Sequence, residues 1–276
     1  MNTISKQYSR QSFLGTDSQE RIARAIVGLV GLGGGGSHIA QQLAHVGIQH
    51  FHLFDADHVE ETNLNRLIGA YATDTECENQ QGNLKVNVAE RLIKGISNSA
   101  VVHKHASRWQ EHPEDLRSCD IVFGCVDGFA QRAELETCTR RYLIPLIDIG
   151  MDVHPRVAGQ PYRMAGQVIV SMPEKPCMRC LGLLTEDALA LEATKYGAAG
   201  NNPQVVWANG ILASTAVGLA VNILTNWTQA EPYVVYLSYD GNNNTIQPHS
   251  HMDYPPNERC PHFPLSEIGD PIFHPL

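Results

Sequence analysis

The sequence predicts an α/β protein whose doubly wound, mostly parallel sheet is continued by antiparallel strands. Over the first 150 residues, short apolar runs alternate with stretches of helical periodicity, which is typical of parallel strands joined by crossover helices. From Met164 onwards the apolar runs alternate with polar residues, as antiparallel strands do. Of the 276 residues, 43% are hydrophobic and 18% are charged, so the chain can build a sizeable core.

The elements of the first half follow from period and length. Helices show apolar residues every three or four positions, as Ile39, Leu43 and Val46 do, whereas buried parallel strands are short continuous apolar runs. In chain order we expect a helix over 17–24, strand Ala25–Val30, helix Ser37–Val46, strand Phe51–Phe54, helix Leu84–Ile96, strands Val101–Val102 and Ile121–Phe123, helix Ala130–Tyr142 and strand Ile144–Ile147.

The second half is expected to hold three antiparallel strands and one long helix. The strands are Val168–Val170, Val234–Leu237 and Thr245–Ile246, and the helix lies around Val205–Trp227. No repeat, low-complexity segment or clear linker separates the two halves. We therefore expect one domain over residues 1–276, with a parallel half at 1–150 and an antiparallel half at 151–276.

Charge and cysteine content restrict the class of protein. The net charge of −9 argues against sequence-independent binding to nucleic acid or anionic lipid. The start, Met1–Lys6, has no apolar run typical of a signal peptide, and the apolar stretch Gly210–Thr225 falls short of a membrane span. Seven cysteines without such a signal favour a reducing compartment. We expect a cytoplasmic protein.

A dense glycine cluster, Gly31-Leu32-Gly33-Gly34-Gly35-Gly36, stands between a predicted strand and a predicted helix. Without side chains, the backbone N–H groups of such a loop can approach a phosphate at the positive end of the helix. Asp55 ends the next strand, where a carboxylate can hold a ribose hydroxyl. These features fit NAD, FAD, S-adenosylmethionine or ATP alike, and a glycine-rich turn without a ligand is the structural alternative.

Cationic residues near the loop favour phosphoryl chemistry over a redox cofactor. Asn63 and Arg66 follow Asp55, and Lys85 opens the next helix, where a dehydrogenase needs no cationic pair. Asp127 follows a strand of the sheet and could hold Mg²⁺ beside a phosphate. Taken singly, each of these residues could equally be a solvated charge, a turn residue or a helix cap.

Several motifs together resemble the ThiF/MoeB/HesA family, the bacterial relatives of ubiquitin-activating E1 enzymes. The matching pieces stand in the order of that family: Tyr8-Ser9-Arg10-Gln11, the glycine loop, Asp55-Ala56-Asp57, Asn63-Leu64-Asn65-Arg66, Lys85, Cys125-Val126-Asp127, Gly166-Gln167-Val168, Pro176–Leu181 and Asn209-Gly210-Ile211. They extend from residue 8 to about 262. Within the family, the sequence resembles the stand-alone bacterial ThiF-type members more than MoeB.

This resemblance implies an E1-like fold with a Rossmann-like sheet, a homodimer and a MgATP-dependent adenylyltransferase. It also implies roles for individual residues. Gly31, Gly33, Gly34, Gly36, Asp55, Asp57 and Asn63 would bind the nucleotide, Arg66 and Lys85 its phosphates, Asp127 magnesium, and Arg10 the nucleotide of the other subunit. The stretch between Arg66 and Lys85 is longer than in MoeB-like members.

The implied reaction activates a carboxylate. Attack of a C-terminal glycine carboxylate on the α-phosphate of ATP gives an acyl-adenylate and pyrophosphate, and the protein must align the two and neutralise the leaving charge. The implied partner is a small ubiquitin-like or sulfur-carrier protein. A conjugating or sulfur-transfer protein would act downstream.

Cys177-x-x-Cys180 has the spacing of half a zinc site. The family closes this site with a second Cys-x-x-Cys, whereas this chain has Cys260-Pro261-His262-Phe263, with Phe263 at the position of the last cysteine. We expect Cys177, Cys180 and Cys260 to bind zinc with His262. Alternatively, His249 or His251 could be the fourth ligand, or the C-terminal tail could pack against the domain without metal. Cys177 and Cys180 could also be ordinary buried thiols.

Family members that form a thioester carry a cysteine in the crossover segment, here 185–202. This chain has no cysteine between Cys180 and Cys260, so we expect adenylation without a thioester at that position. Cys125 and Cys138 stand in apolar patterns typical of a core. Cys77, in a polar loop, is the remaining plausible exposed thiol.

Three other functions stay open at the level of sequence. The first is a non-catalytic subunit that binds nucleotide or the ubiquitin-like protein. The second is a relative that adenylates and dehydrates a tRNA base, which the acidic charge and the lack of a basic tail disfavour. The third is a nicotinamide dehydrogenase, for which NAD binding would not depend on Arg66.

Overall fold

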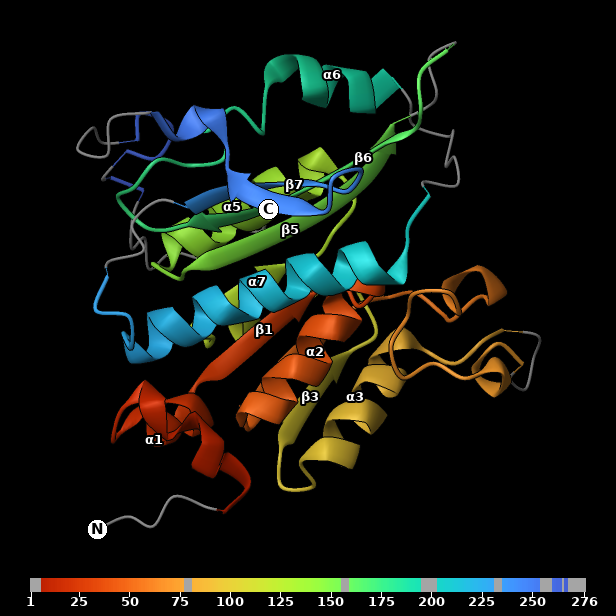
Figure 1. Ribbon diagram of the computed structural model, residues 1–276, viewed down its shortest axis with the longest axis vertical. Coiled ribbons are helices and arrows are strands. Elements are labelled where there is room, and N and C mark those ends of the chain that lie inside the picture. Colours follow the sequence, from red (N-terminus) through yellow and green to blue (C-terminus); the bar gives the residue numbers. More distant parts are fainter. Residues whose placement is uncertain are drawn as a thin grey trace.

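One eight-stranded sheet runs through the molecule in the order β3-β2-β1-β4-β5-β6-β7-β8 (Figure 1). The computed structural model describes residues 6–76, 81–154, 159–194, 203–230, 235–253, 260–264 and 266–267. The strands are β1 (Ile26–Val30), β2 (His50–Phe54), β3 (Val101–His105), β4 (Ile121–Gly124), β5 (Leu146–His154), β6 (Arg163–Ser171), β7 (Val235–Asp240) and β8 (Thr245–Pro248).

The sheet changes direction at β5. Strands β3, β2, β1, β4 and β5 are parallel to their neighbours, whereas β6, β7 and β8 pair antiparallel. β5 takes part in both patterns: Val122 to Gly124 of β4 pair with its first residues, and β6 pairs with its whole length. The predicted fold class, a doubly wound and mostly parallel sheet continued by antiparallel strands, is confirmed. The parallel and antiparallel parts of the sheet meet at β5, and β5 contains residue 150, where the boundary between the two halves was expected.

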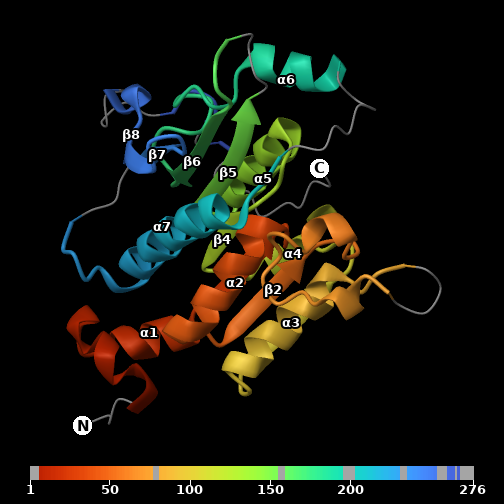
Figure 2. The same ribbon diagram turned by 45° about the vertical axis from the view of Figure 1, so that its right-hand side comes forward.

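Helices cover both faces of the sheet. The α-helices are α1 (Ser18–Arg24), α2 (Gly34–Val46), α3 (Lys85–Ile96), α4 (Pro113–Arg117), α5 (Phe129–Arg141), α6 (Glu186–Thr194) and α7 (Val206–Thr225). Short 3-10 helices are η1 (Lys6–Leu14), η2 (Glu61–Asn63), η3 (Ala72–Asp74), η4 (Trp109–Glu111) and η5 (Ser250–Asp253). Apolar residues of α2, α3 and α7 form one core with one face of the sheet, and those of α4 and α5 form a second core on the other face (Figure 2).

Several boundaries differ from the sequence prediction. Helix α2 begins at Gly34, three residues before the predicted Ser37, because glycines carry no side chains whose period could mark a helix. Strand β5 begins at Leu146 and not at Ile144, since Pro145 lacks the N–H that a strand would pair. Helices α4 and α6 were not predicted. Their five and nine residues are too short or too uniform for a clear apolar stripe.

Helix α7 corrects the expectation that no segment reaches the length of a membrane span. It has 20 residues and is apolar enough to cross a bilayer by length and composition alone, but half of its most apolar window is buried inside the protein. It packs on α2, α1 and the strands β5 and β6. Ala208, Leu212, Ala216 and Ala220 are fully buried there, as in the core helix of a folded domain.

Candidate nucleotide site

A cavity of about 450 Å³ lies at the carboxyl ends of the parallel strands. This is the edge at which open α/β sheets bind ligands. Its lining includes nine of the residues predicted from the sequence: Gly31, Gly33, Gly34, Asp55, Asp57, Asn63, Arg66, Lys85 and Asp127. Residues up to 96 positions apart in the chain, such as Gly31 and Asp127, thus meet in one hollow, because the ends of β1, β2 and β4 lie side by side.

Two glycines of the loop, Gly31 and Gly36, lie too close to neighbouring backbone to carry a side chain. Gly31 has a φ of +87°, and a Cβ there would lie 2.5 Å from the carbonyl oxygen of Cys125. A Cβ at Gly36 would lie 2.0 Å from the carbonyl oxygen of Gly31. By contrast, a Cβ at Gly33 would meet no atom within 4 Å. Gly33 therefore leaves open space beside the N-terminus of α2, whose first N–H groups favour an anion.

Gly36 and Arg10 do not line the cavity. Gly36 lies inside α2 and packs against Gly31, so its absent side chain shapes the loop and does not approach a ligand directly. Arg10 is exposed on η1, which contacts α1. Helix α1 lies beside the start of β1 and not beside its carboxyl end (Figure 1). The expected reach of Arg10 to a second subunit stays a prediction.

Asp55 fastens the glycine loop to the end of β2. Its Oδ2 accepts the N–H of Leu32 at 2.6 Å, and its Oδ1 accepts the N–H of Asp57 at 2.8 Å. Burial raises the pKa of Asp55, while Lys85 and the two N–H groups act in the opposite direction. Asp55 is therefore in place to orient a ligand that enters above the loop.

Lys85 is brought to the cavity despite the long stretch that precedes it. Its Nζ lies 2.7 Å from Asp57 Oδ2, and its N–H donates to the carbonyl oxygen of Asp57 at 3.0 Å. The Lys85 side chain is 12% exposed, whereas that of Asp57 is 69% exposed. A buried ammonium whose partner is exposed can exchange that partner for a phosphate oxygen.

Asp74 braces the stretch between Arg66 and Lys85. Its carboxylate accepts two hydrogen bonds from Arg91 of α3, at 2.9 and 2.6 Å, and one from Asn83 at 3.0 Å. The ion pair with Arg91 and these hydrogen bonds hold the pKa of Asp74 down at about 2. Asp74, which lies in this stretch before the undescribed residues 77–80, is thus tied to α3.

Arg66 lies half-buried against the glycine loop. One guanidinium nitrogen donates to the carbonyl oxygen of Thr62 at 2.6 Å and to Asn65 Oδ1 at 3.0 Å. The Cδ of Arg66 would be 3.4 Å from a Cβ at Gly34. Asn63 is 9% exposed, and its Oδ1 accepts the N–H of Glu60 at 3.1 Å, so it fixes the turn that presents Arg66.

Asp127 follows β4 and is exposed to the cavity. Its Oδ1 accepts a long hydrogen bond, 3.4 Å, from Gln204 Nε2. An exposed carboxylate held this weakly is the kind of oxygen ligand that Mg²⁺ takes together with phosphate oxygens and water. The residue present therefore fits the expected metal.

Gln204, just before α7, and Asn209, within α7, also line the cavity, and neither was predicted from the sequence as a site residue. Asn209 Nδ2 lies 3.5 Å from Gln204 Oε1 and would be 2.3 Å from a Cβ at Gly34. Asn65 Nδ2 donates to the carbonyl oxygen of Gln204 at 3.3 Å. The start of α7 thus closes over the glycine loop. Asn209-Gly210-Ile211 was noted as a matching motif, but nothing in its sequence assigns it to this cavity.

A buried ion pair supports the loop that carries Asp127. Arg132 of α5 pairs with Asp148 of β5, and their side chains are 5% and 0% exposed. Another nitrogen of Arg132 donates to the carbonyl oxygen of Val126 at 2.6 Å. Burial raises the pKa of Asp148 to about 7, against the opposing effect of Arg132. Neither residue stood out in the sequence, since a charge within a helix or strand reads as solvated.

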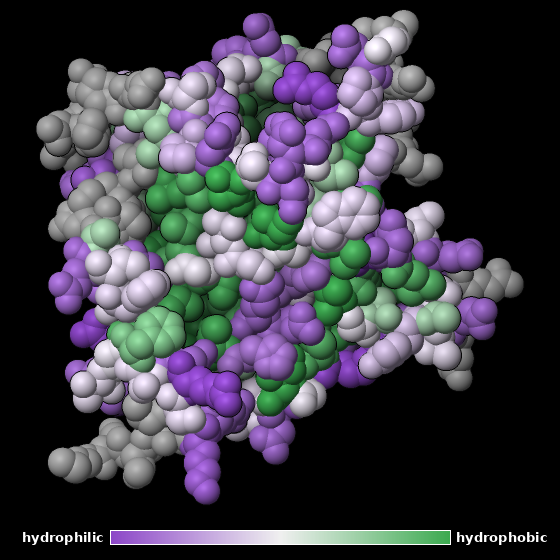
Figure 3. All heavy atoms as spheres, in the orientation of Figure 1, coloured by the Kyte–Doolittle hydropathy of each residue, from purple (hydrophilic) through white to green (hydrophobic). Residues whose placement is uncertain are grey.

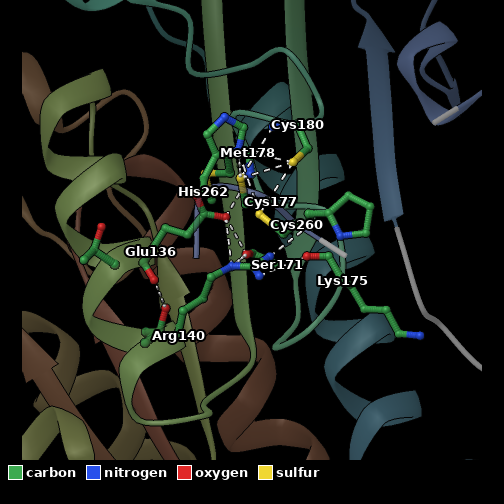
Figure 4. A network of polar contacts seen from close by, with 12 residues as sticks. Glu136, Arg140, Ser171, Lys175, Cys177, Met178, Cys180, Cys260 and His262 are labelled. Atoms are coloured by element: carbon green, nitrogen blue, oxygen red, sulfur yellow. Dashed lines mark hydrogen bonds and ion pairs between the residues drawn. The ribbon is translucent and has the colours of Figure 1, made fainter. Parts of the chain in front are cut away.

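Four potential metal ligands gather near Glu136 and Arg140 of α5 (Figure 4). Cys177, Cys180, Cys260 and His262 each offer one atom, and these atoms all lie within 4.8 Å of one another. The Sγ atoms of Cys177 and Cys180 are 3.7 Å apart, those of Cys180 and Cys260 are 3.6 Å apart, and His262 Nδ1 lies 3.3 to 3.8 Å from all three. Tetrahedral zinc separates its ligand atoms by about 3.5 to 3.8 Å. The donor set therefore fits zinc.

The other proposed histidine ligands are occupied elsewhere. His249 stacks on Tyr236 with ring centroids 4.0 Å apart, and His251 Nδ1 lies 2.8 Å from the carbonyl oxygen of Leu181. Phe263, at the position where the family has its last cysteine, packs against the guanidinium of Arg140 at 4.9 Å. Of the described histidines, His262 is the one that meets the three thiols.

A buried network holds the loop of Cys177 in place (Figure 4). Glu136 Oε1 accepts the N–H of Met178 at 2.9 Å and the hydroxyl of Ser171 at 2.5 Å. Arg140 donates to the carbonyl oxygens of Lys175 and Pro176 at 2.9 and 3.0 Å. Two charged side chains of α5 thereby satisfy the backbone around the first two cysteines.

The remaining described thiols are not exposed nucleophiles. Burial raises the pKa of Cys119 and of Cys138 to about 12. Cys138 lies in the core as predicted, and Cys125 is half-buried, packs against the core and also lines the cavity. Burial also raises the pKa of Cys125. Cys77 lies outside the described residues.

The crossover segment contacts the site through one side chain. Glu192 of α6 accepts the N–H groups of Phe129 and Ala130, at 3.0 and 2.9 Å. It thereby caps the N-terminus of α5, two residues after Asp127. Residues 195–202 of the same segment lie outside the described part.

A doubly wound sheet with a glycine-rich strand-to-helix turn and a polar hollow at its strand ends defines the class of α/β nucleotide-binding proteins. Within this class the chain belongs to the ThiF family, whose profile matches residues 4–262. It is 31% identical over 182 residues to "Adenylyltransferase and sulfurtransferase MOCS3" from Drosophila willistoni, which covers 63% of this chain and 36% of that protein.

Two further comparisons agree with this family. "SAMP-activating enzyme E1" from Haloferax volcanii is 29% identical over 180 residues, or 63% of this chain and 61% of that protein. A crystal structure of E. coli MccB with ATP shares the fold, with a TM-score of 0.68 and 18% identity over 89% of this chain and 71% of that chain. The chain therefore spans less than two thirds of the length of the two curated relatives.

Proposed function

We propose that this chain is an ATP-dependent adenylyltransferase that activates the C-terminal glycine carboxylate of a small ubiquitin-like or sulfur-carrier protein. The observation that carries the proposal is the meeting of Arg66, Lys85 and Asp127 beside the glycine loop in one cavity. Positive side chains and a magnesium ligand there suit a triphosphate better than a nicotinamide cofactor. Membership of the ThiF family supports the same reaction.

The residues would divide the work as follows. The N–H groups at the start of α2 would bind phosphate oxygens in the space beside Gly33. Lys85 and Arg66 would neutralise the charge that builds on pyrophosphate as it leaves, and Asp127 would hold Mg²⁺. Held there, Mg²⁺ would supply positive charge that offsets the charge of the phosphates. The start of α7, through Gln204 and Asn209, would limit access of water to the cavity.

The acceptor is proposed from the relatives. The name of the Haloferax protein states that it activates SAMP, and we propose a small protein of the same general kind for this chain. A carboxyl terminus must reach a pocket bounded by α7 and the glycine loop, so the acceptor needs a slender end such as glycine. A conjugating or sulfur-transfer protein would then take over the activated carboxylate.

We further propose that the acyl-adenylate is passed on without a thioester in the crossover segment. The sequence has no cysteine between Cys180 and Cys260, and burial raises the thiol pKa at Cys119, Cys125 and Cys138. The cluster of Cys177, Cys180, Cys260 and His262 is proposed to bind zinc and to tie the tail to the sheet. A reducing cytoplasm suits both assignments.

Exchange of labelled pyrophosphate into ATP tests the reaction directly. The assay would use MgATP with a panel of purified ubiquitin-like proteins ending in Gly-Gly, each paired with a version that lacks the two glycines. We expect exchange with at least one intact partner, and none with its truncated form or with the Arg66→Ala variant. Tight MgATP binding without exchange for any partner would favour the non-catalytic subunit instead. NAD binding that is unchanged in Arg66→Ala would favour a dehydrogenase.

The proposed enzyme is a homodimer, and the outer side of α7 is the proposed contact. In the view of Figure 3, apolar surface borders this helix on both sides. Trp207 is 57% exposed, and Ser214 and Gly218 also face outwards on the same helix. Small residues on an apolar helix face permit close packing of a second copy.

Gly218→Glu is a clean test of this contact. A side chain at Gly218 meets no atom within 4 Å, so the single chain tolerates it, but a charge there would be buried in the proposed dimer. Gly95→Glu on α3 is the matched control, because that position is equally open. We expect sedimentation equilibrium to give a dimer for the wild type and Gly95→Glu, and a monomer for Gly218→Glu. A dimer in all three would place the interface elsewhere.

A further inference from the structure

A second cluster of metal-binding side chains lies on the other edge of the sheet, apart from the cysteines. His52 of β2, His105 of β3 and Asp115 of α4 each point one ligand atom at a common space, and these atoms all lie within 4.8 Å of one another. His52 Nδ1 is 3.9 Å from Asp115 Oδ1, and His105 Nε2 is 3.5 Å from Asp115 Oδ2. The cluster is built by three elements that the fold alone brings together.

The two imidazole nitrogens are buried and have no hydrogen-bond partner among the described residues. These atoms are His52 Nδ1 and His105 Nε2. The side chains of His52 and His105 are 10% and 11% exposed, whereas Asp115 is 43% exposed and opens the space to solvent. A buried nitrogen without a partner destabilises the fold, and a bound ligand would recover that loss.

A hydroxyl group contacts the other nitrogen of His52. Ser118 Oγ donates its proton to the carbonyl oxygen of Asp115 at 2.7 Å and lies 3.4 Å from His52 Nε2. With the proton of His52 on Nε2, the lone pair on Nδ1 and the Asp115 carboxylate are both acceptors, and a cation between them removes their repulsion.

Neighbouring rings fix the orientation of both histidines. His103 stacks on His52 with ring centroids 4.7 Å apart, Phe54 stacks on His105 at 4.6 Å, and His112 lies against His105 at 4.4 Å. Such stacking holds metal ligands in place, as other supporting contacts do in known metal sites.

We propose that His52, His105 and Asp115 form a binding site for a divalent transition-metal ion, with zinc as the metal and water at the open position. Two imidazoles and one carboxylate are a ligand set of zinc, whereas Ca²⁺ and Mg²⁺ prefer oxygen ligands. Tetrahedral zinc would separate these nitrogen and oxygen atoms by about 3.3 Å. The distances of 3.5 and 3.9 Å, which run to the two oxygens of Asp115, are longer, so the ligands would draw together on binding.

The ion would fix the segment that joins β3 to α4. His105 and Asp115 stand at its two ends, and Ser107, Arg108, Trp109 and Gln110 between them line the cavity of the proposed nucleotide site. Metal binding would therefore hold one wall of that cavity in place. This consequence rests on the proposed function, but the metal site itself does not.

Zinc content per chain tests the site with the full-length protein. After dialysis against buffered zinc, mass spectrometry should find two zinc ions in the wild type, one of them at the cysteines. His105→Ala and Asp115→Ala should each contain one. His154→Ala is the matched control, because it removes an exposed imidazole that does not contact the trio, and it should contain two.

A second measurement separates the two metals. Cobalt at the cysteines gives intense thiolate charge-transfer absorption, whereas cobalt bound by two histidines and a carboxylate gives only weak bands. We expect Asp115→Ala, which removes a side chain that is 43% exposed, to lose one cobalt equivalent with the thiolate absorption unchanged. Two metal ions in both Asp115→Ala and His105→Ala, or loss of an ion in His154→Ala, would overturn the proposal.

Discussion

Lys85 Nζ lies 2.7 Å from Asp57 Oδ2, although the two residues are 28 positions apart in the chain. The ion pair joins the first turn of α3 to the loop after β2 and aims the ammonium group at the cavity. It also explains how Lys85 keeps its place behind a longer connecting stretch than the family pattern has. The bracing carboxylate of Asp74 holds that stretch on α3 from the other side.

Replacing Lys85 by alanine should slow adenylation more than it destabilises the protein. Loss of one group that stabilises transition-state charge typically costs roughly a hundredfold or more in rate. We expect such a fall in pyrophosphate exchange, with thermal unfolding changed little. Lys104→Ala is the control, since Lys104 forms an ion pair with Glu90 at 2.6 Å outside the cavity. Equal activity of both variants would remove Lys85 from the site.

The glycines of the loop should separate into structural and ligand-facing positions. Gly36→Ala places a methyl group against the carbonyl oxygen of Gly31 and should destabilise the fold by about 3 kcal/mol or more. Gly33→Ala meets no protein atom, so its free energy of unfolding should stay within about 1 kcal/mol of the wild type. Calorimetry should instead show weaker MgATP binding for Gly33→Ala. Unchanged affinity there would place the phosphates elsewhere.

Much of the fold could be predicted because its signals are local. A buried parallel strand is a short apolar run and α3 is a regular apolar stripe, so both appear in sequence without neighbours. The start of α2 could not be predicted because its first three residues are glycines, which show no apolar period, and α4 is too short to show one. The positions of Gly31, Asp55 and Arg66 were found for the same reason: each stands directly after a strand or in a recognisable motif.

The missed parts of the site depend on long-range contacts. Arg132 and Asp148 come together only when α5 packs on β5, and Gln204 reaches Asp127 across 77 positions of sequence. The histidines of β2 and β3 likewise come together only because the two strands pair, with His52 beside His103 in the register. Side chains that meet only when distant elements pack have no fixed spacing in the sequence, so a single sequence does not reveal them.

Stability should fall in acid as Asp74 loses its charge. The pKa of Asp74 is lowered in the folded protein to about 2 from an ordinary 3.8, so the unfolded chain binds the proton more tightly. The stabilisation is therefore complete above about pH 4 and is lost as the pH falls towards 2. Its size is about 2 kcal/mol, because one pKa unit corresponds to about 1.4 kcal/mol.

Urea unfolding of the wild type and Asp74→Asn between pH 6 and pH 2.5 measures this contribution. The variant keeps the shape of the side chain but not its charge. The difference in free energy of unfolding should be largest at pH 6 and should shrink below pH 4. A difference that stays constant over this range would mean that Asp74 acts through its hydrogen bonds alone.

Removal of zinc from the cysteine cluster should loosen the tail. Cys260→Ser takes away one of the four donors, and we expect it to lose one zinc ion per chain and to expose the residues around it to proteolysis. Phe263→Ala is the control: it removes the contact with Arg140 but no ligand, so it should retain zinc. Full zinc content in Cys260→Ser would show that the tail closes without metal.

Arg10 offers a test that distinguishes action within one chain from action between two. It is exposed on η1 and does not line the cavity of its own chain. Arg10→Ala and Arg66→Ala should each abolish exchange alone. If Arg10 serves the other subunit, a mixed dimer regains one intact site, formed by the Arg66 of one chain and the Arg10 of its partner. Random pairing makes half of the dimers mixed, so activity should return to about a quarter of the wild-type value. Lack of recovery from co-expressed variants, with mixed dimers verified by mass spectrometry, would assign Arg10 to its own chain or to the surface.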